Sequence, residues 1–255
     1  GMLRSKQIKL VAAFNHEHIF IDPNPDPAIS YAERERLFYL PRSSWADYNT
    51  NLISEGGGVF RRSSKLIKLT PQIKMLLGVE LDFMEPNTLI RAILCAEVDL
   101  LWNGGIGTYV KASVERNLDV GDRSNDALRV NAKELHCRSV GEGGNLGFTQ
   151  LGRIEYALND GLIYTDFIDN SAGVDCSDHE VNSKILLNSV VTSGDMTVKQ
   201  RNKLLADMTD EVAHLVLEDN YFQTRIISLA VVHSVSELDI YRRYMNELEL
   251  TGKVD

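Results

Sequence analysis

Three short apolar runs constrain the fold most, because each leads directly into a loop that contains both glycine and asparagine. The runs are VDLLW, RSVGE and LIYTDFI, and the loops cover residues 103–109, 141–149 and 169–177. Thr149 suits a helix N-cap after the second loop, and apolar residues recur from there at helical spacing as far as Gly161. This repeated order of strand, turn and helix predicts a parallel sheet flanked by helices.

The run KLVAAF at residues 9–14 suits a further strand that is buried on both faces. We interpret it as the second strand of a Rossmann-like unit, with residues 2–8 as the end of the helix before it. No G-x-G-x-x-G fingerprint, whose backbone amides hold a pyrophosphate, precedes this strand. The predicted fold class is therefore α/β: a Rossmann-like open parallel sheet with flanking helices, lacking its first strand and fingerprint, followed by an all-helical segment. The predicted domains are 1–182, a partial dinucleotide-binding domain, and 183–255, the helical C-terminal segment.

Charge and hydropathy exclude two classes of partner. The net charge of −9 argues against nucleic-acid binding, which needs a basic face to meet phosphates. No apolar run is long enough to span a bilayer, and the N-terminal GMLRSKQIKL does not resemble a signal peptide. The three cysteines are scattered without CxxC spacing, which favours reduced thiols in a cytoplasmic protein.

The three loops are expected to share one ligand crevice. In open parallel sheets, ligands bind beyond the carboxyl ends of the strands, where all three loops would lie. Each loop carries an asparagine, namely Asn103, Asn145 and Asn170, which offers donors and acceptors to a carboxamide or a ribose hydroxyl. Any single Asn-Gly pair is equally well explained as a turn. Three such loops on one edge favour a ligand site.

The amino-acid sequences of these loops resemble those of a known protein family. EGGN at 142–145, a Thr-capped helix, a strand and then DNSAGVDCSDHE at 169–180 follow the order found in the glutamate dehydrogenase cofactor domain. The stretches WNGGIGTYVK, VGEGGNLGFTQLGRIEYA and DNSAGVDCSDHEVN are most similar to the large bacterial NAD-specific glutamate dehydrogenases. The resemblance covers most of residues 7–190 and is specific, because several motifs match in order.

The resemblance implies a set of site residues for the cofactor and the substrate. Ser177 matches a serine that reaches the substrate carboxylate when the cleft closes, although Ser177 and Glu180 also read as a helix capping box. The loop at 103–109 departs from the family's usual Pro-Cys-Ala-Thr stretch, and Ser171 and Ala172 depart from its Ala-Gly turn. The expected cofactor-binding residues are Asn15, Asn103, Gly143, Gly144, Asn145 and Asn170.

NAD is the expected cofactor, because the end of the KLVAAF run carries no arginine to meet a 2′-phosphate. Asn15 there could accept a ribose hydroxyl, but a plain strand end is equally consistent. No catalytic residue is predicted, since the family's lysine and aspartate belong to an upstream substrate domain. The resemblance thus implies a piece of a larger enzyme that converts glutamate to 2-oxoglutarate and ammonium, inactive alone and homo-oligomeric in its parent.

The histidines and cysteines indicate no further site, and two alternative functions stay open. His16 and His18 would share one face of a strand, but no third ligand is suggested, so no metal site is predicted. Cys95 and Cys137 read as small core residues, and Cys176 lies at an expected helix start that favours a thiolate. The alternatives are an amino-acid dehydrogenase acting on leucine or phenylalanine, and a non-catalytic Rossmann-like regulatory or interaction module.

Overall fold

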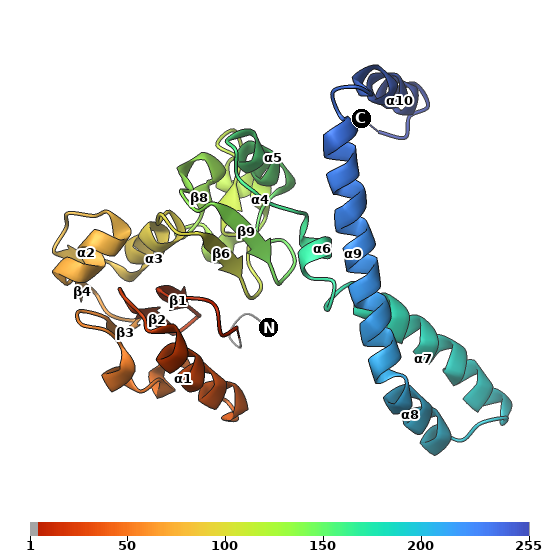
Figure 1. Cartoon of the computed structure of the whole chain (residues 1–255), viewed down its shortest axis with the longest axis horizontal. Helices are drawn as coiled ribbons and strands as arrows, with labels where there is room; N and C mark the ends of the chain where they lie inside the picture. Colours follow the sequence, from red (N-terminus) through yellow and green to blue (C-terminus); the bar gives the residue numbers. More distant parts are fainter. Residues whose placement is uncertain (1–4, 255) are drawn as a thin grey trace. The chain divides into compact units, whose positions relative to one another are not determined.

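Residues 5–254 are described by a computed structural model, which is a mixed α/β structure (Figure 1). The chain divides into two compact units, the first ending at Tyr164 and the second beginning at Thr165. This boundary lies before the one predicted after residue 182. The functional division into 1–182 and 183–255 stays a prediction.

The first unit opens with a three-stranded antiparallel sheet of order β1-β2-β3. Its strands are β1 (Ala12–Phe14), β2 (His18–Ile21) and β3 (Gly58–Arg61). The prediction of a parallel strand at KLVAAF is therefore wrong, and β1 is only half-buried. The physical reason is a tight turn: the Oδ1 of Asn15 accepts hydrogen bonds from the amides of Glu17 and His18 at 2.9 and 2.7 Å. So short a connection makes neighbouring strands antiparallel.

Short helices and a second strand pair follow in the first unit. Helix α1 (Pro27–Tyr39) begins where the Asp26 side chain accepts from two backbone amides, and the 3₁₀ turns Trp45–Asp47 and Thr50–Leu52 come after it. Strands β4 and β5 pair antiparallel around helix α2, and helix α3 continues the chain. The predicted helix starts at Thr70–Pro71 and at Pro86 are both confirmed. The bounds are β4 (Ile67–Lys68), α2 (Pro71–Leu77), β5 (Phe83–Met84) and α3 (Pro86–Leu94).

Parallel pairing is confirmed for the runs VDLLW and RSVGE. Strand β6 (Leu100–Asn103) pairs parallel with β9 (Ser139–Glu142), and β7 (Val110–Lys111) pairs parallel with β8 (Val130–Asn131). The residues between β7 and β9 also form helix α4 (Asn117–Val120) and the 3₁₀ turns Arg123–Asn125 and Ala132–Glu134.

Helix α5 (Gln150–Leu158) follows the loop at residues 141–149, called the glycine loop below, as predicted. Thr149 caps its start, because the Thr149 hydroxyl accepts from the Gly152 amide at 2.9 Å. The strand predicted at LIYTDFI is mostly wrong. It is reduced to one parallel bridge from Leu162 to Ser139, and helix α6 (Asp166–Asp169) takes the rest. Two aspartates in the first turn favour the helix, because they interact well with its positive N-terminal dipole.

One apolar core fixes the parallel strands in the first unit. It runs from Ile19 on β2 through helices α2 and α3 to Val140 on β9 and Phe148 at the end of the glycine loop. Burial of this apolar surface is the main stabilising term, at roughly 25 cal/mol per Å². The loops that follow β6 and β9 therefore extend from a rigid base.

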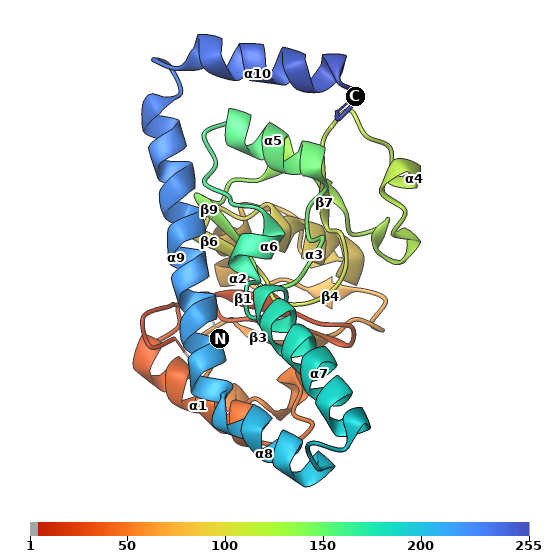
Figure 2. The same cartoon turned by 90° about the vertical axis from the view of Figure 1, so that its right-hand side faces the viewer.

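The second unit is helical throughout its described part, which confirms the prediction of an all-helical C-terminal segment. After α6 it contains α7 (Asp175–Ser193), α8 (Val198–Asp207), α9 (Thr209–His233) and α10 (Leu238–Leu250). Helices α7, α8 and α9 contact one another, as both views show (Figures 1 and 2). None of the helices formed by residues 5–254 combines the length and apolar character that a membrane span requires.

Candidate functional site

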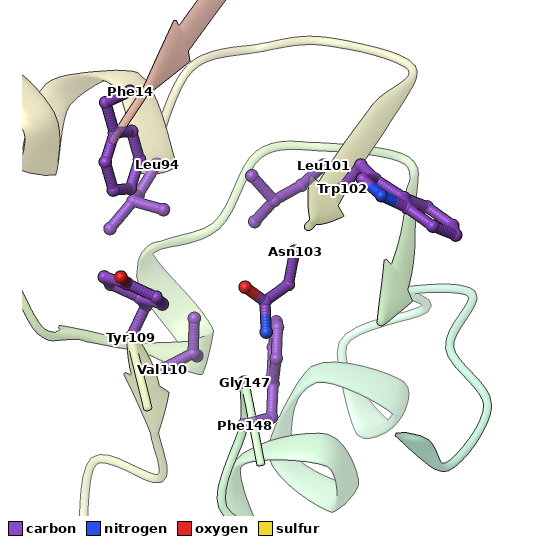
Figure 3. A pocket seen from close by; sticks show the side chains of 9 residues that line it. All are labelled: Phe14, Leu94, Leu101, Trp102, Asn103, Tyr109, Val110, Gly147 and Phe148. Atoms are coloured by element: carbon purple, nitrogen blue, oxygen red, sulfur yellow. The ribbon is translucent and has the colours of Figure 1, made fainter. Parts of the chain in front are cut away.

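A buried amide marks the carboxyl end of β6. Asn103 is the last residue of that strand, and its backbone carbonyl accepts from the Gly143 amide at 2.8 Å. Its side-chain Nδ2 is buried and has no hydrogen-bond partner among residues 5–254. The amide lies in a small cavity of about 40 Å³ and points toward Gly147 and Phe148 (Figure 3). An unpaired buried donor is costly, so it indicates a site for an acceptor group.

The glycines of the 141–149 loop make room for neighbouring parts of the same unit. A Cβ atom at Gly141 or Gly143 would lie 2.6 or 2.4 Å from the indole ring of Trp102. A Cβ at Gly144 would lie 2.7 Å from the carbonyl oxygen of Gly105. These glycines therefore let two loops approach closely. Their role in cofactor binding stays a prediction.

A buried ion pair holds the glycine loop in place. Glu142 is fully buried at the end of β9, and its carboxylate accepts from Nε and Nη2 of Arg153 at 2.7 and 3.0 Å. It also accepts from the Phe148 amide at 3.0 Å, so both ends of the loop meet at one carboxylate. A bidentate pair of this kind fixes geometry as well as charge. Sequence reasoning missed it, and an acidic residue at the end of an apolar strand was the available signal.

A hydrogen bond also joins the loop at 103–109 to the loop at 141–149. The Thr108 hydroxyl donates to the Leu146 carbonyl at 2.7 Å, and its amide donates to Asp122 at 2.9 Å. Arg129, whose side chain is fully buried, donates to the Thr108 carbonyl at 2.9 Å and pairs with Asp126 at 2.5 Å. The loop 103–109 is therefore anchored from both sides.

The predicted cofactor residues of the first unit fall into two groups. Asn103, Gly143 and Gly144 come together at the ends of β6 and β9, and Asn145 lies exposed on the same loop. Asn15 lies apart from them and lines a different, open cavity of about 280 Å³ with Ser44 and Trp45 among its walls. The structure gives Asn15 a local role in the β1–β2 turn. Its role toward a cofactor stays a prediction.

Asn170 and Ser177 belong to the second unit. Asn170 is the C-cap of α6. Its side-chain amide packs so closely on Gly173 that a Cβ atom there would lie 2.6 Å from the Asn170 Oδ1. The capping-box interpretation of Ser177 and Glu180 is wrong, because α7 begins at Asp175 and Ser177 is already inside its first turn. The Ser177 hydroxyl instead donates to the Gly173 carbonyl at 2.9 Å.

His16 and His18 differ in burial, and Cys95 and Cys137 belong to or pack against the core. The ring of His18 contacts Ser44 at 3.1 Å, and His16 is exposed. Cys137 is buried in the core as predicted, and Cys95 packs against it. Burial raises the pKa of the Cys95 thiol to about 11, which makes it a poor nucleophile at neutral pH.

Parallel strand pairs with cross-linked polar loops at their carboxyl ends define a mixed α/β protein, and in open parallel sheets that edge is where ligands bind. The chain belongs to the family described as bacterial NAD-glutamate dehydrogenase, catalytic domain, whose profile matches residues 1–230. The predicted resemblance is thereby confirmed.

Three relatives, each named NAD-specific glutamate dehydrogenase, are similar to most or all of the chain. Identity is 61% over 255 residues with the protein of Halomonas elongata and 60% over 255 residues with that of Pseudomonas aeruginosa. It is 56% over 247 residues with that of Mycobacterium tuberculosis, covering 94% of the chain. The first two matches cover 100% of the chain, yet the matched part is only 15–16% of the length of the three relatives.

One buried donor in the first unit suits an acceptor group of a ligand, but the cavity beside it is too small to enclose a dinucleotide. The unpaired Nδ2 of Asn103 suits a carbonyl or hydroxyl acceptor. The cavity of about 40 Å³ is far below the roughly 300–1,000 Å³ of small-molecule pockets.

Proposed function

We propose that this chain is part of an NAD-dependent glutamate dehydrogenase and supplies most of its cofactor domain. The observation that carries this proposal is the family match over residues 1–230, together with 61% identity to an NAD-specific glutamate dehydrogenase. The parent enzyme converts glutamate to 2-oxoglutarate and ammonium. NAD supplies the hydride acceptor when bound, and the protein supplies placement and electrostatics.

In this proposal, the loops after β6 and β9 hold the cofactor. Asn103 donates its unpaired amide to the carboxamide or a ribose hydroxyl, and Asn145 and Asn170 orient the nicotinamide half. Gly143 and Gly144 let the backbone approach the dinucleotide, Asn15 meets the adenosine ribose, and Ser177 reaches the substrate carboxylate. What supports these roles is the buried donor of Asn103 and the order of the loop motifs.

The proposed sheet is Rossmann-like in the part that carries the site. The parallel order of β6 and β9, extended by the bridge to Leu162, supports this reading. A substrate domain elsewhere in the parent chain provides the acid–base groups, and the parent is a cytoplasmic homo-oligomer. Because the chain spans 16% of its relatives' length, we infer that it binds NAD weakly and has no activity alone.

The test is glutamate-dependent NADH formation by the full-length parent, measured beside this chain. Asn103→Ala and Asn145→Ala should raise the KM for NAD about tenfold or more, since one good hydrogen bond to a ligand is worth roughly 1.5 kcal/mol. Asn202→Ala on α8 is the matched control and should leave the KM unchanged. If the parent reduces NAD only with leucine or phenylalanine, the proposed substrate is wrong and the parent is a dehydrogenase of that amino acid. A parent with no amino-acid-dependent reduction would overturn the proposal.

A further inference from the structure

Helices α7 and α9 bring three metal-ligating side chains together in the second unit. Asp175 and His179 lie one turn apart on α7, and Asp219 faces them from α9. Their ligand atoms all lie within 4.8 Å of one another. The Nε2 of His179 is 3.7 Å from Asp175 Oδ1 and 3.3 Å from Asp219 Oδ2. The imidazole is thus placed between two carboxylates.

The 3.3 Å contact between His179 and Asp219 is a long hydrogen bond, and the 3.7 Å contact between His179 and Asp175 is too long for one, so the imidazole is not tightly paired with either carboxylate. An N–H···O bond spans about 2.7–3.2 Å. Two ligands bound tetrahedrally at about 2.0–2.2 Å from one zinc ion lie about 3.3–3.6 Å apart. Of the observed distances, 3.3 Å lies within this second range and 3.7 Å lies just beyond it. A neutral imidazole can also donate from Nε2 to only one carboxylate at a time.

The carboxylate of Asp175 supplies an independent observation. Its Oδ2 is buried and has no hydrogen-bond partner among the described residues, and its side chain is only 18% exposed. Two carboxylates held together with an unsatisfied buried oxygen are unfavourable without a cation between them.

We propose that Asp175, His179 and Asp219 bind one divalent transition-metal ion of the zinc class. One imidazole and two carboxylates match the ligand types of zinc, whereas calcium and magnesium take oxygen ligands and reject the imidazole. Three protein ligands leave at least one position for water. No chemistry at the ion is required, because its role follows from what the ligands connect.

The ion would fix α9 to the segment that carries Ser177. Asn220, next to the ligand Asp219, donates from Nδ2 to the Ile168 carbonyl at 2.6 Å and to the Ser171 hydroxyl at 3.3 Å. The same turn of α9 therefore holds both the metal ligand and the start of the 169–177 loop. A metal ion bound here would stabilise the 169–177 loop by fixing the turn of α9 to which the loop is hydrogen-bonded. This inference is independent of the activity proposed above.

The test is titration of the 255-residue chain with zinc chloride by calorimetry, and with Co²⁺ followed by its visible absorption. We expect one strong site and a rise in the melting temperature of the helical unit. His179→Ala and Asp219→Asn should each weaken binding at least tenfold. His214→Ala, which removes an exposed histidine of α9, is the matched control and should bind like the wild type.

Circular dichroism separates loss of the site from loss of the fold. If His179→Ala unfolds, Asp219→Asn carries the test, because amide and carboxylate are nearly the same size. Equal zinc affinity in the wild type and in folded Asp219→Asn would overturn the proposal. So would the absence of a Co²⁺ spectrum in the wild type.

Discussion

Arg153→Met should be among the most damaging substitutions in the first unit, because it leaves the Glu142 carboxylate charged and buried. Glu142 is 0% exposed and Arg153 only 7%, and two charge-assisted bonds of 2.7 and 3.0 Å join them. Removing one partner of a buried pair costs about 3–5 kcal/mol. Glu142→Gln should cost less, because it leaves no buried carboxylate charge and Arg153 keeps its bond to Gln150 at 3.1 Å. The double variant should recover part of the loss, since no unpaired charge remains.

The assay is urea unfolding followed by tryptophan fluorescence, which reports on the first unit alone because both tryptophans, Trp45 and Trp102, lie there. With a slope of about 2 kcal/mol per molar urea, a loss of 4 kcal/mol lowers the midpoint by roughly 2 M. Arg116→Met is the matched control, because it breaks a surface pair with Asp119 and should leave the midpoint nearly unchanged. A similar small shift for Arg153→Met would refute the reasoning.

Three further predictions concern single groups of the first unit. Gly147→Ala places a Cβ 2.0 Å from the Asn103 Nδ2, so it should cost about 1–3 kcal/mol in urea unfolding. Burial raises the pKa of Asp122, but hydrogen bonds such as that from Asn125 outweigh it and leave the pKa low. Its contribution to stability is therefore present above about pH 4 and lost as the pH falls further, so Asp122→Asn should flatten the acid limb of stability against pH. Cys95, with a pKa of about 11, should react with a thiol reagent at pH 8 only after unfolding, and rapid modification of Cys95 itself in the folded chain, located by peptide mapping, would contradict its burial.

Local signals in the sequence predicted the elements that local interactions decide. Thr70, Pro71 and Thr149 begin their helices as expected, because a side-chain cap and a fixed proline φ need only the next few residues. The parallel pairing of β6 with β9 was also predictable, since glycine loops followed both apolar runs. The antiparallel pairing of β1 was not. An apolar run of that length suits either direction, and the Asn15 turn decides it.

The site shows a similar division between local and long-range information. The sequence identified Asn103 as a loop asparagine, but not that its Nδ2 would lack a partner, because that depends on packing against Gly147 and Phe148. The cluster of His179 and Asp219 was missed for a related reason. The two residues are 40 apart in the chain and meet only through the packing of α7 on α9.

Glycine content alone therefore says little about a ligand in this chain. A side chain at position 141 or 143 would collide with Trp102, and one at position 144 would collide with the carbonyl of Gly105. Close approach of protein to protein therefore accounts for these glycines, so their pattern alone does not indicate a cofactor. The Nδ2 of Asn103 is different, because packing within the unit leaves that buried donor without an acceptor. A cost of about 1–3 kcal/mol for such a group persists unless something outside residues 5–254 accepts the bond. It is this donor, rather than the glycine pattern, that makes the carboxyl ends of β6 and β9 the place to look for bound NAD.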